Sequence, residues 1–504
     1  MPYNRLIVIM HDTWRLANIG CYADAHRSLF PKDWIRTPHL DELASESIVF
    51  EDGFAEALPT VQVRKAFFTG KRVFPYRRYQ EWFSSRDAYI HRMPGWQPLQ
   101  PDDITLTEIL KMNRYVTGTV TDTSMLYFPA FNFHRAFDTW HWVRGKDMWY
   151  RIPLEGPRSF LRGGYLTPTY GKERAPLDKI YSTHLKETVH EEDFYSAQTY
   201  RNAVKWLDDN YWRDKWFLYI DEWDPHEPWW PPQSYVDMYD PGYEYENIEE
   251  LEKMSWGIPD KGEVWTERQE RHIRALYAGM CTYADRWLGY LLDKVKLLGL
   301  MEDTVIVFTC DHGTLMGEHD GSPFMERPYR DSYDERDRAY GSSLWEGKIF
   351  GKPSWPGMYD YIVRVPLMIR LPDQSHAGKR VKGFWQHHDI APTILSLLGI
   401  KTPSYMEGKD LMPLVTGEAE KMRGHIVCGY GNTILVRDDR WHYVTMDRRQ
   451  TKYPKGRDML FDMKNDPLQM KNVIDEHPEV VKEGNERIKG LFEDYNIVPN
   501  WEPP

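Results

Sequence analysis

Short apolar runs alternate along the chain with longer segments of helical periodicity. Four runs are rich in Val, Ile and Phe and show no polar alternation: Leu6–Met10, Trp216–Ile220, Val305–Thr309 and Val365–Arg370. Such runs are typical of strands that are covered on both faces. The best helical pattern spans about Glu267 to Leu298, with apolar residues on one face. Strands that alternate with helices predict an α/β fold with a large, mostly parallel central sheet flanked by helices.

The pattern changes after Gly417. The segment from His425 to Met446 predicts two or three antiparallel strands with turns at Gly-Tyr-Gly-Asn and Arg-Asp-Asp-Arg, and a helix from about Pro478 to Tyr495 follows. We therefore predict a large α/β domain over residues 1–417 and a small subdomain of sheet plus helix over 418–504. Residues 321–357 are charged, aromatic and rich in Gly and Pro, which predicts a long surface insertion.

Carboxylates and imidazoles follow three of the predicted strands. They are His11-Asp12, the segment Asp221–His226, and Asp311-His312. In a parallel α/β sheet, functional residues gather beyond the carboxyl ends of the strands, and such side chains converging there can hold a divalent metal. Asp and His also cap helices at strand ends, but three such groups together favour a metal site. His387 and His388 precede a helix, where we expect two partly exposed histidines beside a capping Asp389.

Thr60 and Arg64 lie four residues apart, which places them one turn apart at the start of a predicted helix. A helix N-terminus favours anions, and a guanidinium can hold a tetrahedral oxyanion through two hydrogen bonds. A threonine hydroxyl on a metal would be activated as a nucleophile. A Thr cap followed by Arg is common, so this spacing alone does not establish a site.

Composition excludes several classes of protein. The 504 residues carry 64 Lys and Arg against 76 Asp and Glu, a net charge of −12, and there is no basic run, which argues against nucleic-acid binding. No apolar stretch approaches the roughly 20 residues of a membrane span. The four cysteines are scattered and show no metal-type pairing, so we expect no disulfide framework and a cytoplasmic location. A homo-oligomer is left open.

Several motifs follow one another in order along almost the whole chain. They are TPHLDELASESIVFEDGFAEALPTVQVRKAFFTGKR, DPHEPW, VIVFTCDHGTLMGEH, VRVPLMIR, HHDIAPTILSLLGI, MEGKDLMPLVTGE and LFDMKNDPLQMKNV. The first resembles the segment around the motif Cys/Ser-x-Pro-x-Arg-x-x-x-x-Thr-Gly of the sulfatase family, within the alkaline phosphatase superfamily. The third resembles that family's second metal-binding strand end, and the others resemble its further landmarks.

This resemblance implies an alkaline phosphatase-like fold, an ester hydrolase activity and a divalent metal. The ligands it implies are Asp12, Thr60, Asp311 and His312. It also implies that Arg64 contacts the anion and that His226 contacts the substrate or the leaving group. A lysine before the VPLMIR strand is expected in the site too. We choose Lys352 for it, with Lys348 as the rival.

The chain departs from the sulfatase pattern where the chemistry is decided. Thr60 replaces the Cys or Ser that becomes formylglycine, and threonine cannot give that aldehyde. Gln62 replaces the motif proline. Thr121–Ser124 stands where sulfatases have Gly-Lys-x-His, so the cations that grip sulfate are missing from this segment. The sequence Asp12-Thr13-Trp14-Arg15 resembles the Asp-Gln-Trp-Arg of phosphonate monoester hydrolases and phosphodiesterases, and His312 also suits that branch.

These departures predict a hydrolase of phosphodiesters or phosphonate monoesters that forms a covalent intermediate on Thr60. The alternatives are a sulfate ester hydrolase without formylglycine and a non-catalytic homologue that binds an anion or a partner. The metal is expected to be Mn²⁺ or Zn²⁺, with Ca²⁺ or Mg²⁺ as further options, and a second ion on Asp221, Asp224 or His226 is left open. The residues expected to contact a small phospho- or sulfo-ester are Thr13, Asp122, Ser124 and Trp229. For Trp229, packing in the core is an equal alternative.

Overall fold

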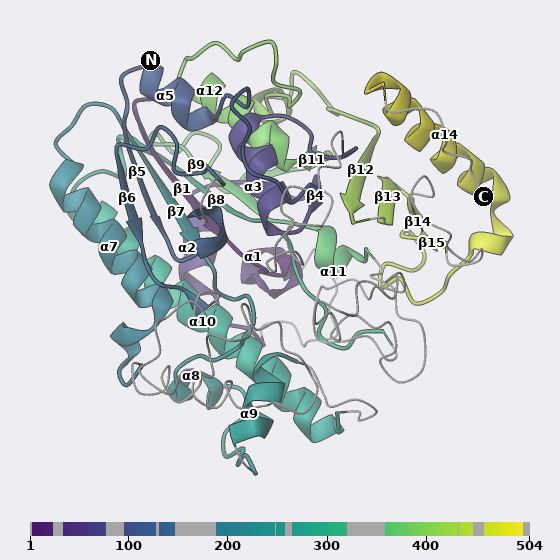
Figure 1. The fold of residues 1–504 in the computed structure, drawn as a ribbon, viewed down its shortest axis with the longest axis horizontal. Helices are drawn as coiled ribbons and strands as arrows, with labels where there is room; N and C mark the ends of the chain where they lie inside the picture. Colours follow the sequence, from purple (N-terminus) through teal and green to yellow (C-terminus); the bar gives the residue numbers. More distant parts are fainter. Residues whose placement is uncertain are drawn as a thin grey trace, which may run out of the picture.

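An eight-stranded sheet forms the centre of the computed structural model (Figure 1). The structure describes residues 3–23, 34–76, 95–127, 131–146, 188–246, 248–257, 265–319, 358–431, 433–446 and 458–496. The strand order is β10-β2-β9-β8-β1-β7-β5-β6. The strands are β1 (Arg5–His11), β2 (Ile48–Phe50), β5 (Val116–Thr121), β6 (Thr139–Trp142), β7 (Trp216–Glu222), β8 (Thr304–Cys310), β9 (Leu367–Arg370) and β10 (Arg380–Val381).

The prediction of a mostly parallel sheet is confirmed. Strands β8, β1, β7, β5 and β6 run parallel to one another, and β10 is parallel to β2. The exception is β9, which is antiparallel to both β8 and β2. The predicted insertion at 321–357 lies outside the described residues.

Helices cover both faces of the sheet, as the apolar strands require. Two separate apolar cores result, because successive residues of β1 point to opposite faces: Ile7 and Ile9 lie in one core, and Leu6 and Val8 in the other. One face carries α2 (Pro38–Ser45), α7 (Tyr195–Asn210) and α10 (Glu267–Leu297). The other carries α3 (Thr60–Thr69), α5 (Leu106–Met112) and α12 (Ile390–Leu397). Shorter helices are α1 (Gly20–Ala23), α8 (Gln233–Val236), α9 (Ile248–Ser255), α11 (Asp360–Val363) and α13 (Met412–Thr416).

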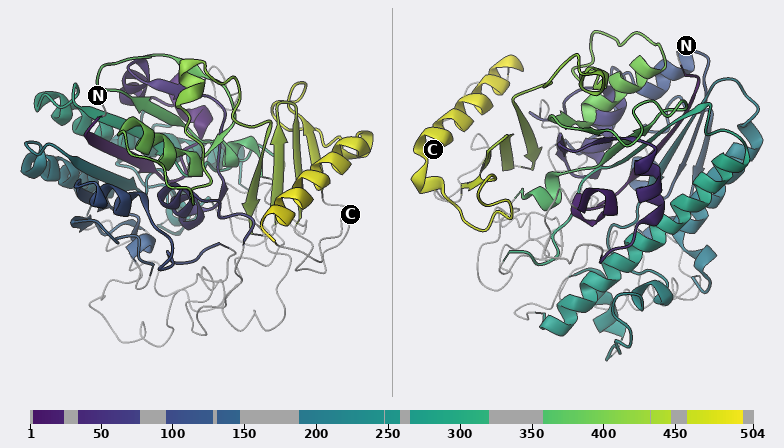
Figure 2. Two further views of the ribbon diagram at one scale, coloured as in Figure 1. Left: turned by 90° about the horizontal axis from the view of Figure 1, so that it is seen from above. Right: turned by 180° about the vertical axis from the view of Figure 1, so that it is seen from behind.

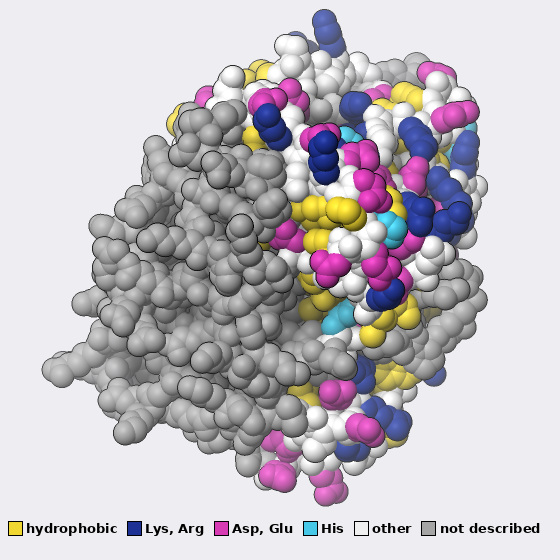
Figure 3. All heavy atoms as spheres, turned by 90° about the vertical axis from the view of Figure 1, so that its right-hand side faces the viewer, with side chains coloured by type: hydrophobic (Ala, Val, Ile, Leu, Met, Phe, Trp, Pro, Cys, Tyr) yellow, Lys and Arg dark blue, Asp and Glu magenta, His cyan; other side chains and the backbone are white. Residues whose placement is uncertain are grey.

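A second sheet lies to one side of the first and carries α14 (Pro478–Asp494) (Figure 2). Its order is β15-β14-β13-β12-β4. The antiparallel strands are β12 (His425–Tyr430), β13 (Thr433–Asp438), β14 (Trp441–Met446) and β15 (Met459–Asp462). The two predicted turns connect β12 to β13 and β13 to β14. Strand β15 is a further strand that the sequence pattern did not predict. Figure 3 shows the face on this side of the molecule, where the described Lys and Arg side chains are interspersed with Asp and Glu.

The fifth strand of this sheet comes from the N-terminal part of the chain. Strand β4 (Ala57–Leu58) pairs in parallel with β12, with Ala57 opposite Gly429. After Pro59, β4 leads directly into α3, which begins at Thr60. The small sheet therefore holds the strand that delivers Thr60, although the two segments are far apart in sequence. The division of the chain at residue 417 stays a prediction. A further pair consists of β3 (Gly53–Phe54) and β11 (Trp385–Gln386).

Candidate active site

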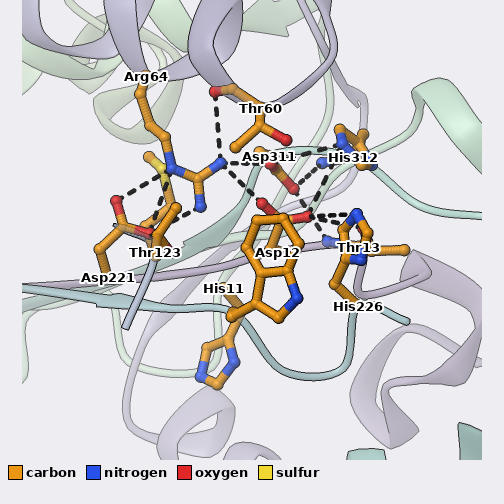
Figure 4. A network of polar contacts seen from close by, with 12 residues as sticks. His11, Asp12, Thr13, Thr60, Arg64, Thr123, Asp221, His226, Asp311 and His312 are labelled. Atoms are coloured by element: carbon orange, nitrogen blue, oxygen red, sulfur yellow. Dashed lines mark hydrogen bonds and ion pairs between the residues drawn. The ribbon is translucent and has the colours of Figure 1, made fainter. Parts of the chain in front are cut away.

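Asp12, Asp311 and His312 meet at the carboxyl ends of β1 and β8 (Figure 4). These strands pair in register, with His11 opposite Cys310, so the residues that follow them are neighbours. One ligand atom from each of the three lies within 4.8 Å of the others, and all three side chains are buried. The described residues hold no other such group of three or more His, Cys, Asp or Glu side chains. Two carboxylates and an imidazole form a donor set that fits a divalent ion.

Thr60 enters the site from the opposite direction, as the first residue of α3. Its side chain is buried and lies beside Asp311 and Asp12 (Figure 4). The helix N-terminus adds partial positive charge there, which favours an anionic ligand. The fold thus brings Thr60 to the three residues that the resemblance grouped with it.

Arg64 lies one turn further along α3 and is completely buried. Its Nη2 donates to Asp221 Oδ1 at 2.7 Å and its Nε to Asp221 Oδ2 at 3.0 Å. Its Nη1 lies 3.1 Å from Asp12 Oδ2 and also contacts Asp311. The sequence predicted an anion contact for this arginine, and the structure pairs its guanidinium with three carboxylates of the chain itself.

The charges of this group are not balanced, because Asp12, Asp221 and Asp311 face the single guanidinium of Arg64. Burial and the neighbouring charge of Asp311 raise the pKa of Asp12 well above its usual value. Burial opposes ionisation of Asp311 as well, but His312 and Arg64 hold its pKa below the usual range. A divalent cation among these carboxylates would stabilise both in the ionised form.

His226 lies in the segment that follows β7. Its Nε2 lies 4.0 Å from Asp12 Oδ1, and its Nδ1 contacts the carbonyl oxygen of Glu227 at 2.7 Å. The ring stacks on Trp223, with 4.0 Å between the ring centroids. The imidazole of His226 therefore stands beside Asp12, in the group formed by Asp12, Asp311 and His312.

The residues predicted to contact substrate have different surroundings. Thr13 is buried, its hydroxyl donates to Asp12 Oδ1 at 2.7 Å, and its N–H donates to Asp311 Oδ1 at 3.0 Å. Its φ of 62° is uncommon for a β-branched residue. Thr13 therefore orients the carboxylates of the metal-binding group.

Asp122 and Trp229 are buried as well. Asp122 Oδ1 accepts the N–H of Trp223 at 2.7 Å, so this carboxylate holds the chain where it leaves β7. Trp229 is 0% exposed, and its indole donates to the carbonyl of Pro225 at 2.9 Å. This places Trp229 in the core, the alternative that the sequence left open, and not on a wall of the site. Ser124 begins a short 3₁₀ helix, and its side chain is not among those described. Lys352 and Lys348 lie outside the described residues.

The groups considered for a second metal are separated by the fold. Asp221 pairs with Arg64, and it also accepts hydrogen bonds from Thr123 at 2.8 Å and Tyr219 at 2.6 Å. Asp224 pairs with Lys146. Thr123 and Tyr219 are site residues that sequence reasoning missed, because a hydroxyl beside a strand end carries no recognisable signal.

The expectation for His387 and His388 was wrong. Both are buried, at 0% and 2% exposure, because the turn that carries them packs against α3 and the end of β8. Burial lowers the pKa of His387 to about 4 and that of His388 to about 3, so both are neutral at pH 7. The carboxylate of Asp389 makes no capping bond to α12 and accepts instead from the N–H of Gln386 at 2.8 Å.

A group of buried side chains suited to a divalent ion therefore lies at the carboxyl edge of the mostly parallel sheet. A model of the sulfatase family matches residues 4–400, and a model described as the C-terminal part of N-sulphoglucosamine sulphohydrolase matches residues 350–494. The chain belongs to the sulfatase family, whose enzymes hydrolyse esters and use divalent metal ions.

Individual relatives are distant but extend over most of the chain. An ulvan-active sulfatase of Formosa agariphila is 24% identical over 482 residues, covering 93% of this chain and 76% of the relative. The fold is similar to the phosphonate monoester hydrolase of Agrobacterium radiobacter, with a TM-score of 0.66, 19% identity and coverage of 97% and 96%. It is also similar to BT4656, solved with its substrate D-glucosamine-2-N,6-O-disulfate, with a TM-score of 0.65, 17% identity and coverage of 98% of each chain.

None of the helices among the described residues is both long and apolar enough to cross a membrane. The cytoplasmic location that the cysteines predicted stays a prediction.

Proposed function

We propose that this chain hydrolyses phosphodiesters or phosphonate monoesters through a covalent intermediate on Thr60. The observation that carries the proposal is the position of Thr60, which begins α3 beside Asp12, Asp311 and His312. A threonine at this position can attack directly, whereas it cannot form the aldehyde of a sulfatase. At the end of β5, the segment that holds the sulfate-gripping cations in sulfatases contributes instead the carboxylate of Asp122 and the hydroxyl of Thr123.

The roles of the residues follow from this arrangement. Asp12, Asp311, His312 and the Thr60 hydroxyl would hold a divalent ion, which would supply Lewis acidity to lower the pKa of that hydroxyl and to neutralise charge on the substrate. The Thr60 hydroxyl releases its proton to solvent as its oxygen attacks phosphorus in line, and the bond from phosphorus to the leaving oxygen breaks. His226 gives that oxygen a proton. Water then attacks phosphorus and passes a proton back to His226, while the bond to Thr60 breaks and the Thr60 oxygen regains a proton from solvent. Arg64 keeps the carboxylates in place and contributes its positive charge to the anion site.

The proposal is tested by assaying the purified chain with an aryl phosphodiester, a phosphonate monoester and an aryl sulfate ester side by side. Mn²⁺, Zn²⁺, Mg²⁺ and Ca²⁺ are added to protein stripped of metal. We expect turnover of the phosphorus esters and none of the sulfate. Mass spectrometry of acid-quenched protein should find the phosphoryl or phosphonyl group on the peptide containing Thr60.

The competing function is sulfate ester hydrolysis without formylglycine. The ulvan-active sulfatase, which aligns with 93% of this chain, favours it. Turnover of the sulfate ester alone would establish this alternative and overturn the first proposal. Failure of every ester with every metal would point to a non-catalytic homologue, an interpretation that the intact group of buried metal-binding side chains argues against.

A further inference from the structure

Lys146 is a buried lysine outside the metal-binding group, and its ammonium reaches the segment that carries His226. It follows β6 and is 4% exposed. Its Nζ pairs with the carboxylate of Asp224 and donates to the carbonyl oxygen of Pro228 at 3.3 Å. These two residues lie two positions before and two positions after His226. A single charge therefore connects both ends of the His226 segment, defined here as residues 224–228.

Asp224 is fixed by two further elements. Its carbonyl oxygen contacts His11 Nδ1 at 2.7 Å, and its Oδ2 accepts from the hydroxyl of Ser196 on α7 at 2.6 Å. The same hydroxyl contacts Glu222. Burial, together with the charges of Asp122 and Asp224, raises the pKa of Glu222 well above its usual value.

Lys146 is the cationic partner of Asp224 in this group. A buried carboxylate that loses such a partner is strongly destabilised where it stands. The approach of Lys146 is also fixed sterically, because a Cβ at Gly145 would lie 2.0 Å from the carbonyl oxygen of Asp122. The chain can pass this close only with glycine at position 145.

Two contacts of the His226 ring come from its neighbours along the chain. Its Nδ1 contacts the carbonyl of Glu227, and its face stacks on Trp223. The position of the imidazole relative to Asp12 therefore follows the position of the segment as a whole.

We propose that Lys146 is a positioning residue, which holds the His226 segment so that the imidazole faces the leaving group of the substrate. This inference rests on the proposed function for its catalytic consequence, whereas the placement of the segment by Lys146 does not depend on it. The residue acts through Asp224 and Pro228 and does not itself touch substrate.

The test compares Lys146→Met with Lys146→Arg, which retains a charge, and with Lys205→Met, which changes an exposed lysine of α7. Amide hydrogen exchange is measured on peptides that cover residues 223–229 and, as an internal reference, on peptides from β8. We expect exchange in 223–229 to rise about 10-fold or more in Lys146→Met, and to change little in the other two variants or in β8.

The kinetic part measures kcat for a phosphodiester with an alkyl leaving group and for one with a 4-nitrophenyl leaving group. A good leaving group needs no proton. We therefore expect kcat of Lys146→Met to fall about 10- to 100-fold with the alkyl ester and less than about 3-fold with the nitrophenyl ester. The double variant Lys146→Met/His226→Asn should have the same kcat as His226→Asn alone, because both substitutions remove the same function, protonation of the leaving group.

Unchanged exchange in 223–229, an equal loss on both esters or additive losses in the double variant would each overturn the inference. Absence of turnover in the wild-type chain would overturn the proposed function instead, and the exchange measurement would still decide whether Lys146 holds the segment. If Lys146→Met does not fold, Lys146→Met combined with Asp224→Asn removes both charges and is put through the same measurements.

Discussion

Two groups of charged side chains lie around α3, and they differ in how many carboxyl groups face one guanidinium. The first, the site cluster, consists of Asp12, Asp221, Asp311, Arg64 and His312. The second, the anchor cluster, is the pair of Glu56 and Arg72. In the anchor cluster one carboxylate faces one guanidinium at 3.4 Å. In the site cluster three carboxylates face one guanidinium.

The remaining hydrogen-bonding groups show the same contrast. Glu56 accepts the N–H groups of Val73 at 2.8 Å and Phe74 at 3.2 Å, and Arg72 donates to the carbonyl of Val427 at 2.7 Å. The anchor cluster is therefore complete within the chain and ties the segment after α3 to β12. The site cluster brings three carboxyl groups together at one guanidinium, and burial makes their full ionisation costly unless a cation joins them. The two clusters therefore differ in the number of carboxyl groups for each guanidinium. Several carboxyl groups gathered at one cation are typical of a functional site.

The largest expected effect is on turnover in Thr60→Ala. Loss of the nucleophile should lower kcat by at least ~10⁴-fold, because the covalent intermediate on Thr60 can no longer form. Thr60→Ser is the matched control, since it keeps a hydroxyl and should retain measurable turnover. Metal content by mass spectrometry shows whether the ion is still bound. Wild-type rates in metal-loaded Thr60→Ala would exclude the nucleophile role.

The second prediction compares how replacing Arg64 and Arg72 changes the free energy of unfolding. Arg64→Met leaves three buried carboxylates without their partner and should lower the free energy of unfolding by about 3–5 kcal/mol in protein stripped of metal. Added Mn²⁺ should recover part of this loss, because the ion replaces positive charge. Arg72→Met should be destabilised as well, but to the same extent with and without metal. Denaturant unfolding of both variants checks the pair, and an equal response to Mn²⁺ would remove the distinction between the clusters.

A smaller effect is expected for Asp12→Asn. Titration calorimetry should show metal affinity reduced by about 100-fold, which corresponds to ~2.7 kcal/mol. The melting temperature of the metal-free protein should stay the same or rise, since burial already raises the pKa of Asp12 and the amide resembles the neutral acid. A lower melting temperature without metal would indicate that Asp12 serves the fold as much as the site.

The smallest effect concerns the pH dependence of stability through Glu56. Burial raises the pKa of Glu56 to about 7 from the usual 4.5. The folded chain therefore binds this proton more tightly than the unfolded chain does. The resulting stabilisation is complete below pH 4.5 and is lost as the pH rises through about 7. We expect the free energy of unfolding to fall by about 2–3 kcal/mol through Glu56 between pH 5 and pH 8.

Glu56→Gln keeps an acceptor for the two N–H groups and cannot titrate. Its unfolding free energy should depend less on pH than that of the wild type over the same range. The prediction is contradicted if the free energy of unfolding of the wild type rises between pH 5 and pH 8 and Glu56→Gln flattens this rise. The pH dependence then has the opposite sign, because Arg72 keeps the carboxylate of Glu56 ionised.

Much of the fold was visible in the sequence because it depends on local patterns. The apolar runs predicted β1, β7 and β8, and the helical periodicity predicted α10, whose observed end at Leu297 is one residue from the expected one. The antiparallel direction of β9 was not visible, because a run of apolar residues is the same in either direction. The pairing of β4 with β12 was not visible either, because it joins segments more than 300 residues apart and because β4, with two residues, is too short to show a hydrophobic pattern.

The sequence by itself determined which side chains follow the strands, and so placed Asp12, Asp311 and His312 together at one edge of the sheet. Only the tertiary structure decided what surrounds them. The bond from Arg64 to Asp221 spans 157 residues, and the bond from Lys146 to Pro228 spans 82. Strand ends are set by short-range hydrophobicity, whereas the partner of a buried charge is set by which distant segments the packed core brings within hydrogen-bonding distance.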